Sequence, residues 1–356
     1  MNIQSLNFLK TLMTTPSPCG YEARGREAWR KVVKTFADKV KGDVHGNSIA
    51  VLNAHKGQRI MLAGHIDEIA FQVKFIHKEG YIYFNPLGGF DVGIIPGRKV
   101  RIHTKAGDVL GVIGRRAIHL IDAANRSKCS EMHDLFIDIG VTNSDEANKL
   151  VEIGDPITYD SNFEELRNGL CVSKAFDDKI GAFIVAEVMR NVAKKKSEFK
   201  ASLYSVATVQ EEVGLRGAQT AAYGIDPVVG IAIDVTHATD TPDTSKEKEK
   251  FGDVKMNSGV VIARGPNINT KVFELLEKLA KKKKIAYQIE PSPKPTGTDA
   301  NVMQVTRAGV ATGLLSIPCR YMHTMTEIVS MKDVEACITL LTEFCLAIDE
   351  KTDFTL

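Results

Sequence analysis

Histidine and acidic residues stand beside apolar stretches at five places in this sequence. Two single residues follow such stretches: Asp234 ends GIAID, and His323 comes after ATGLLSI. The other three places carry pairs, which are His65 with Asp67, Asp177 with Asp178, and Glu211 with Glu212. In an open α/β sheet, binding sites gather where the strands end at their carboxyl edge. We therefore expect these side chains to converge if their strands share one sheet.

Each pair alone also has an ordinary structural explanation. The first fits a polar strand end, the second fits the N-terminus of a helix, and the third fits a strand that runs out into a solvated turn. The combination favours chemistry, because so many clustered carboxylates would repel one another and resist burial without a cation.

Two divalent ions about 4 Å apart would neutralise such a cluster. Imidazole and carboxylate ligands suit zinc, cobalt or manganese better than calcium. A dinuclear centre uses one bridging carboxylate, terminal ligands on each ion, and a further carboxylate that takes a proton from water. The residues at the five places meet that requirement, so the sequence predicts metal-assisted hydrolysis.

The segments that must position these residues show two kinds of sequence pattern. Residues 69–162 contain short β-rich runs between glycine and proline turns, which is typical of a small all-β barrel or sandwich. On both sides of this block, helical and strand patterns alternate. We therefore expect an α/β fold, with a central mixed β-sheet flanked by helices and formed by 1–68 and 163–356, into which a β-barrel domain is inserted at 69–162.

Local patterns predict several individual elements. Two helices are expected in the first 40 residues, and a third at 299–308. The last helix is expected to begin after Ser330, with Asp333 as a capping-box partner. The charged stretch 240–253, which contains SKEKEK, is expected to be a loop.

The composition excludes several classes of protein. The 356 residues are 44% hydrophobic and 25% charged, as in an ordinary globular protein. A net charge of +2 is too small to indicate a nucleic-acid or anionic-membrane partner. No apolar stretch approaches the roughly 20 residues that span a membrane, and the six cysteines form no CxxC pair. We expect a cytoplasmic protein with no nucleic-acid or membrane partner.

Eight motifs spread over the whole chain resemble one family, the tetrahedral (TET-type) dinuclear metalloaminopeptidases. That family includes glutamyl and leucyl aminopeptidases and relatives named endoglucanases. The motifs are TPSPCGYE (15–22), AGHIDEIA (63–70), AFDDKIG (175–181), QEEVGLRGA (210–218), AIDVTHATDTP (232–242), GPNINTKVFELL (265–276), PTGTDAN (295–301) and RYMHT (320–324).

The resemblance implies two divalent metal ions, with zinc as the first expectation and cobalt or manganese as alternatives. It implies that Asp177 bridges the two ions. The terminal ligands would be His65 and Asp234 on one ion, and Glu212 and His323 on the other.

The resemblance also implies the activity and the assembly. Glu211 would be the general acid/base in hydrolysis of the N-terminal peptide bond of peptides, and Asp67 the acid beside His65. The fold would be zinc-exopeptidase-like. The inserted domain at 69–162 would be a PDZ-like dimerisation domain, and dimers would build a hollow tetrahedral dodecamer.

Several points stay open. Relatives often carry serine where this chain has Thr324, and the segment 240–257 is unusually rich in lysine and glutamate, so substrate preference or assembly contacts could differ. Alternatives are a related dinuclear carboxypeptidase or deacylase, a glycoside hydrolase, and a non-catalytic shell that kept the fold. The preferred N-terminal residue is not indicated. TGTDAN (296–301) could line its pocket, and the alternative is that Thr298 or Asp299 simply caps a helix.

Overall fold

The computed structural model describes residues 1–54, 57–242 and 244–356. Contacts within the chain divide it into two compact units. The first, which we call the α/β unit, comprises Met1–Glu68, Phe163–Met322 and Thr326–Leu356. The second, which we call the barrel unit, comprises Ile69–Asn162 and His323–Met325.

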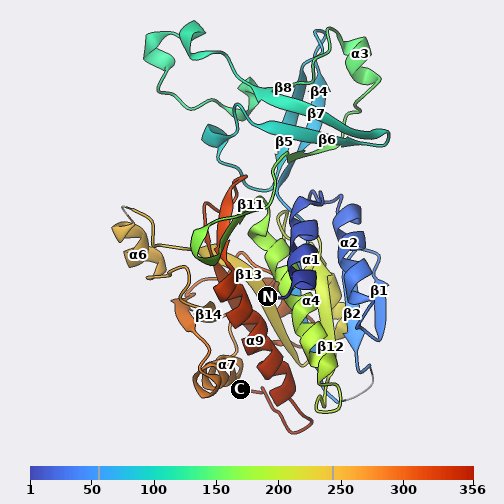
Figure 1. The fold of residues 1–356 in the computed structure, drawn as a ribbon, viewed down its shortest axis with the longest axis vertical. Coiled ribbons are helices and arrows are strands. Elements are labelled where there is room, and N and C mark those ends of the chain that lie inside the picture. Colours follow the sequence, from blue (N-terminus) through green and yellow to red (C-terminus); the bar gives the residue numbers. More distant parts are fainter. Residues whose placement is uncertain (55–56, 243) are drawn as a thin grey trace. The chain divides into compact units, whose positions relative to one another are not determined.

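A mixed β-sheet forms the centre of the α/β unit (Figure 1). Its central strands β12, β3, β13 and β16 are parallel neighbours in that order, so they end at the same edge. Within the described residues the sheet has eleven strands, which are β1 (Lys39–Gly42), β2 (Ser48–Leu52), β3 (Arg59–His65), β10 (Glu164–Glu165), β11 (Leu170–Ser173), β12 (Ser202–Thr208), β13 (Val229–His237), β14 (Val260–Arg264), β15 (Tyr287–Pro291), β16 (Ala311–Arg320) and β17 (Glu327–Ser330).

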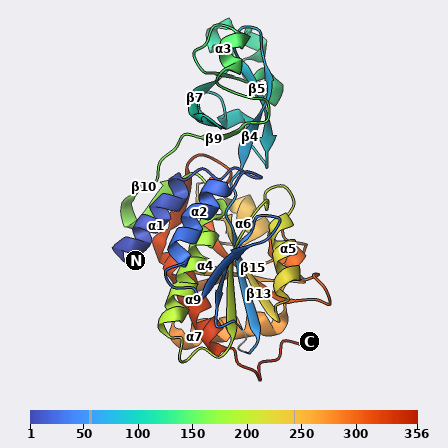
Figure 2. The same cartoon turned by 90° about the vertical axis from the view of Figure 1, so that its right-hand side faces the viewer.

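Helices cover both faces of this sheet. Figure 2 shows α1, α2, α4 and α9 on one side and α5 on the other. α7 packs against α9, and α8 packs against α5, so each joins the layer of its neighbour. The helices of the α/β unit are α1 (Ile3–Thr14), α2 (Ala23–Val33), α4 (Phe176–Lys194), α5 (Arg216–Ile225), α6 (Ser245–Phe251), α7 (Thr270–Lys283), α8 (Ala300–Met303) and α9 (Met331–Ala347).

α4 is the central helix of its layer. It contacts β3, β12 and β13 below it and α1, α2 and α9 around it, which explains why its sequence is apolar on nearly every face. Phe176 and Phe183 are fully buried, and burial of such a side chain stabilises a fold by about 1.5–3 kcal/mol. The indole N–H of the buried Trp29 donates to the backbone oxygen of Ala182, which fixes α2 on α4.

The contact between α4 and β3 depends on a missing side chain. A Cβ atom built on Gly64 would lie 2.3 Å from the backbone carbon of Gly181, far inside van der Waals contact. Glycine at 64 therefore lets the helix backbone approach the strand closely. Because His65 follows Gly64 and Asp177 lies in the first turn of α4, this approach brings the two side chains together.

The barrel unit is a closed six-stranded barrel among the described residues. Its core stacks Phe71 on Phe90 and sets both against the ring of Tyr159. The strands are β4 (Ala70–Ile76), β5 (Ile82–Leu87), β6 (Lys99–Thr104), β7 (Gly107–Gly114), β8 (Phe136–Asp138) and β9 (Pro156–Tyr159), and the short helix α3 (Ser144–Asn148) lies in this unit. The predicted fold class, a mixed sheet flanked by helices with an inserted barrel, is confirmed.

Three local predictions were wrong. The helix expected at 299–308 is only one turn, α8, which Arg307 in a left-handed conformation and Gly309 follow. The stretch 240–253 contains the helix α6, although Asp243 lies outside the described residues. Asp333 is no capping-box partner, because its carboxylate accepts the backbone N–H groups of 257 and 259.

No helix in the part of the chain that the structure describes is both long and apolar enough to cross a membrane.

Candidate metal centre

The carboxyl edge of the parallel strands gathers most of the predicted site residues. His65 is the last residue of β3 and pairs in register with Thr208, the last residue of β12. Asp234 lies in the neighbouring strand β13, and Asp177 lies in the first turn of α4. The exposed fractions of His65, Asp177 and Asp234 are 1%, 7% and 6%, so the edge of the sheet carries a buried polar cluster.

His65 stands at the centre of this cluster. Its Nε2 lies 3.1 Å from Asp177 Oδ1 and 3.7 Å from Glu211 Oε2. Its Nδ1 lies 3.1 Å from the backbone oxygen of Asp67 and 3.5 Å from the Asp67 carboxylate. A histidine that ligates a metal commonly has its second ring nitrogen held in this way, which orients the ring and its tautomer.

Two groups of side chains around His65 could hold a metal ion. In one, His65 joins Asp177 and Glu212, and in the other it joins Asp178 and Asp234. In each group the candidate ligand atoms lie within 4.8 Å of one another. Four of the five predicted ligands therefore come together in the α/β unit.

Asp178 was not predicted as a ligand, and its contacts explain its place in the second group. One carboxylate oxygen accepts the backbone N–H of His65 at 3.0 Å, and the other accepts that of Gly181 at 3.0 Å. The peptide bond between Asp177 and Asp178 is cis. With both oxygens engaged, Asp178 ties β3 to α4, and we assign it a positioning role.

The protonation of the cluster reflects its crowded charge. Burial and the nearby Asp177 charge raise the pKa of Asp234, and burial and the Asp234 charge raise the pKa of Glu211. Burial alone would lower the pKa of His65, but Glu211, Asp177 and Asp67 together raise that pKa well above its ordinary value. The carboxylates of this cluster raise one another's pKa because the protein places too little positive charge among them.

The donor set fits divalent metal ions. It offers one imidazole and several buried carboxylates around it, which is a ligand mixture that suits transition metals such as zinc. Cations would also relieve the repulsion that raises the pKa of Asp234.

The adjacent glutamates after β12 are arranged by Asp67. Gln210 has a φ of +54°, so the chain leaves the strand direction there, and a regular strand would send Glu211 and Glu212 to opposite faces. The backbone N–H of Glu211 donates to Asp67 Oδ1, and that of Glu212 donates to Asp67 Oδ2, each at 3.2 Å. Glu211 is 8% exposed and Glu212 is half-buried, so the two carboxylates occupy different environments.

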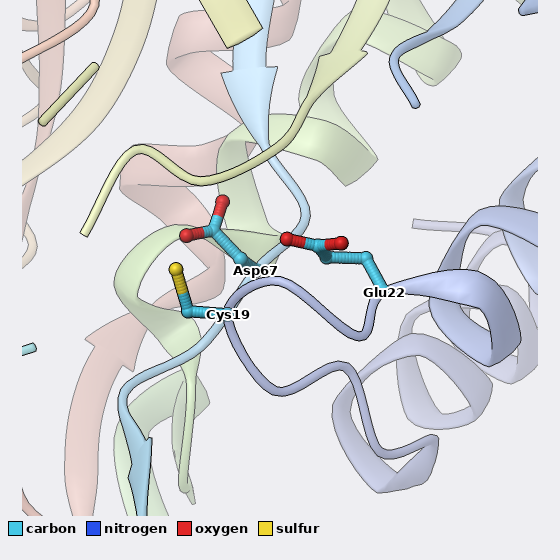
Figure 3. A group of neighbouring side chains, drawn as sticks. All are labelled: Cys19, Glu22 and Asp67. Carbon is cyan, nitrogen blue, oxygen red and sulfur yellow. The ribbon is translucent and has the colours of Figure 1, made fainter. Parts of the chain in front are cut away.

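Two residues near Asp67 were missed by the sequence analysis. Figure 3 shows the Glu22 side chain, at the start of α2, pointing toward Asp67, with the Cys19 sulfur on another side of the same carboxylate. Burial and the Asp67 charge raise the pKa of both the Cys19 thiol and the Glu22 carboxyl. The motif TPSPCGYE contains both residues, but their distance from Asp67 along the chain hid the contact.

His323 is placed with the barrel unit. It has a φ of +61°, and a Cβ atom built on Gly89 would lie 3.3 Å from its Nδ1. Among the described residues, neither group around His65 includes it. Its role as a metal ligand therefore stays a prediction.

A cavity of about 820 Å³ lies elsewhere in the α/β unit. It is found where β3, β13 and β16 begin, and Arg59, Asn267 and the segment 352–356 contribute to its lining. Its lining contains none of the predicted site residues, and it lies at the opposite ends of these strands. The chemistry of the side chains, and not the size of this cavity, identifies the centre around His65.

Known proteins match the chain along nearly its whole length. The profile of the family described as M42 glutamyl aminopeptidase matches residues 46–340. The chain belongs to this family. The lysyl aminopeptidase of Pyrococcus furiosus is 38% identical over 336 residues, which cover 94% of this chain and 94% of that protein.

Solved structures agree with this membership. The TET aminopeptidase of the marine sediment archaeon Thaumarchaeota archaeon SCGC AB-539-E09 matches with a TM-score of 0.92 and 35% identity over 97% of each chain. The Pyrococcus horikoshii TET1 peptidase, which can assemble into a tetrahedron or a large octahedral shell, matches with a TM-score of 0.85 and 30% identity over 97% of this chain and 100% of that one.

The M42 family member described here is thus a metal-dependent aminopeptidase, a hydrolase that acts on peptide bonds. The carboxypeptidase, deacylase and glycoside hydrolase alternatives are not favoured. The resemblance to TET-type aminopeptidases is confirmed.

Proposed function

We propose that the chain removes N-terminal residues from peptides at a dinuclear metal centre, with Glu211 as the general acid/base. Two divalent ions, zinc first and cobalt or manganese as alternatives, would be held by five residues. Asp177 would bridge the two ions, His65 and Asp234 would hold one ion, and Glu212 and His323 would hold the other.

Divalent ions at such a centre acidify water and polarise the peptide carbonyl. In this proposal, side chains of the protein position the general base and transfer the proton. Asp67 holds the backbone of Glu211, so that the Glu211 carboxylate faces the cluster around His65. That carboxylate takes the proton of the attacking water and delivers it to the amine that leaves.

One observation supports this division of roles above the others. Glu212 shares a possible ligand group with His65 and Asp177, whereas Glu211 belongs to neither group although its Oε2 is 3.7 Å from His65 Nε2. A general base at a metal centre has these properties, since it lies beside the ligands without being one of them.

The test compares Glu211→Gln with Glu212→Gln. In Glu211→Gln, kcat on an aminoacyl p-nitroanilide should fall by roughly 10²- to 10⁴-fold while the metal content of the purified protein is unchanged. Glu212→Gln should lose bound metal as well as activity. Activity like that of the wild type in Glu211→Gln would rule out its assignment as the base.

Metal analysis tests the count and the identity of the ions. Inductively coupled plasma mass spectrometry of metal-replete protein should give two divalent ions per chain. Activity recovered after dialysis against a chelator and addition of zinc, cobalt or manganese in turn would identify the effective metal. Fewer than two ions in a replete sample would contradict the dinuclear centre.

We also propose that the chain forms a homo-oligomer in which dimers build a tetrahedral dodecamer. The ability of the P. horikoshii relative to assemble into a tetrahedron supports this proposal. The barrel unit is the proposed dimerisation domain. Light scattering after size-exclusion chromatography should give the mass of twelve copies of the 39.0 kDa chain, and a monomer mass would contradict the proposal.

A further inference from the structure

Asp299 has an unusual position at the start of α8. It occupies the N-cap position, yet its side chain makes no capping hydrogen bond. Instead Asp299 Oδ2 accepts a hydrogen bond from Thr208 Oγ at 2.6 Å, and the residue is only 2% exposed. Asp299 Oδ1 is buried and has no hydrogen-bond partner among the described residues. A buried carboxylate oxygen without a donor is costly, so its retention indicates a ligand.

A hydrogen bond links Asp299 to the strand edge that carries the metal centre. Thr208 is the register partner of His65 across β12 and β3, so a single side chain links Asp299 to the edge where His65 stands. The charges of His65 and Asp67 act on Asp299, and the charge of Asp299 acts in turn on Glu211 and Asp234. α8 itself packs against β13 and β16.

Most of the other carboxylates at this edge already have tasks. Asp67 accepts two backbone N–H groups, and Asp178 also accepts two. Asp177, Glu211, Glu212 and Asp234 are the proposed ligands and base. Asp299 Oδ1, in contrast, has neither a hydrogen-bond donor among the described residues nor a task in the proposed function.

An aminopeptidase has to recognise a cation at this edge. The free amino terminus of a peptide is an ammonium group with N–H donors, and a buried carboxylate binds such a group through a charge-assisted hydrogen bond. We propose that Asp299 Oδ1 accepts a hydrogen bond from the N-terminal ammonium group of the substrate and so selects peptides with a free amino terminus. This inference rests on the proposed function and names the group that determines its specificity for chain ends.

The test measures binding and not turnover. The probes are an amino-acid hydroxamate and the matching hydroxamate without the α-amino group, titrated into metal-loaded protein. In Asp299→Asn the affinity for the amino hydroxamate should fall roughly 10- to 100-fold, as expected for loss of a charged hydrogen bond. The affinity for the des-amino probe should stay within about threefold, because that probe offers no ammonium group.

Thr208→Val is the matched control. It removes the hydrogen bond to Oδ2 but keeps the carboxylate, so the ratio of the two affinities should remain near that of the wild type. Metal content is measured for each variant. If Asp299→Asn weakens both probes equally, leaves both unchanged, or loses metal, the role of Asp299 in binding the ammonium group is wrong.

A structure of the wild-type protein with the amino hydroxamate gives a test that needs no variant. The α-nitrogen should lie within hydrogen-bonding distance of Asp299 Oδ1, and a nitrogen bound elsewhere would overturn the proposal. The two proposals can fail separately. If neither hydroxamate binds wild-type protein, the metal centre itself is wrong, whereas an unchanged preference for the amine in Asp299→Asn contradicts only the role of Asp299.

Discussion

Asp67 and Glu211 are joined by a hydrogen bond in which the backbone N–H of Glu211 donates to Asp67 Oδ1 at 3.2 Å. The other carboxylate oxygen of Asp67 accepts the backbone N–H of Glu212, and the Asp67 carboxylate lies 3.5 Å from His65 Nδ1. The Asp67 side chain thereby positions both His65, at the end of β3, and the turn after β12 that carries the proposed base Glu211. Asp67 therefore affects catalysis through the residues that it positions.

Asp67→Asn should lower both catalysis and metal affinity. The amide keeps the shape of the side chain but replaces one acceptor oxygen with an N–H donor, which would face a backbone N–H. Loss of such an outer contact typically reduces activity or metal affinity about 10- to 100-fold. Steady-state kinetics and competition with a chelator measure the two effects. Asp122→Asn, an exposed N-cap aspartate without a capping hydrogen bond, is the control and should behave like the wild type.

A buried ion cluster beside this site should dominate the acid sensitivity of the fold. Glu68 accepts hydrogen bonds from the ammonium groups of Lys174 and Lys179 and from the backbone of Ser17, and all three side chains of the ion cluster are buried. Glu68→Gln would leave two buried ammonium groups without their counter-ion. Such a change destabilises a protein by about 3–5 kcal/mol, which urea denaturation can measure.

The pH dependence of that effect has a definite sign. Burial opposes ionisation of Glu68, but Lys174 and Lys179 outweigh it and lower the pKa to about 2. A carboxylate with a lowered pKa stabilises the fold fully above its unfolded pKa, near 4.3, and loses this contribution as the pH falls toward about 2. The difference in stability between wild type and Glu68→Gln should therefore shrink below about pH 4. Glu165→Gln, which breaks the exposed pair with Lys10, should change stability by less than about 1 kcal/mol.

This centre could be predicted from the sequence because each of its parts has a local sequence pattern. Apolar strands followed by His65, Glu211 or Asp234 can be recognised in a single chain, and parallel strands bring their ends together. Local patterns likewise predicted two helices in the first 40 residues, which the structure forms as α1 and α2, and a last helix after Ser330, which is α9. The inserted barrel could be predicted because short β-rich runs at 69–162 interrupt the alternating helix and strand patterns on both sides.

Contacts between distant segments were beyond such reasoning. From the sequence, TGTDAN could line a pocket or Asp299 could cap a helix, and only the fold shows the Asp299 carboxylate bonded to Thr208. Asp333 has the spacing of a capping partner, but its carboxylate instead accepts the backbone N–H groups of Asn257 and Gly259 in a separate loop. In each case a side chain of suitable type found a partner that no local pattern encodes.

Gly64→Ala should disturb the centre through packing alone. Its new Cβ would lie 2.3 Å from the backbone of Gly181, so α4 would have to move away from β3 and carry Asp177 away from His65. Overpacking of this kind destabilises a fold by about 1–3 kcal/mol, and metal affinity should fall with it. Gly224→Ala in α5 is the matched control, since its Cβ would meet no atom within 4 Å, and it should be neutral or slightly stabilising.

Removal of the metal should make the stability of the protein strongly dependent on pH. In the metal-free cluster, burial raises the pKa of Asp234 and of Glu211, and the charges of neighbouring carboxylates raise both further. A carboxyl group whose pKa is raised by folding stabilises the fold below its unfolded pKa, about 4, and this contribution is lost as the pH rises. The Tm of chelator-treated protein should therefore fall between about pH 5 and about pH 8.

The metal-loaded protein should show the opposite balance. Metal ions bind deprotonated carboxylates and neutral imidazole, so their affinity rises with pH, and a ligand at 1,000 times its Kd adds about 4 kcal/mol to the free energy of unfolding. The gap in Tm between loaded and metal-free protein should accordingly widen from pH 5 to pH 8 in differential scanning calorimetry. Asp234→Asn removes one of the crowded charges and should flatten the pH dependence of the metal-free protein. A gap that stays constant or narrows would mean that these carboxylates are not neutralised by metal.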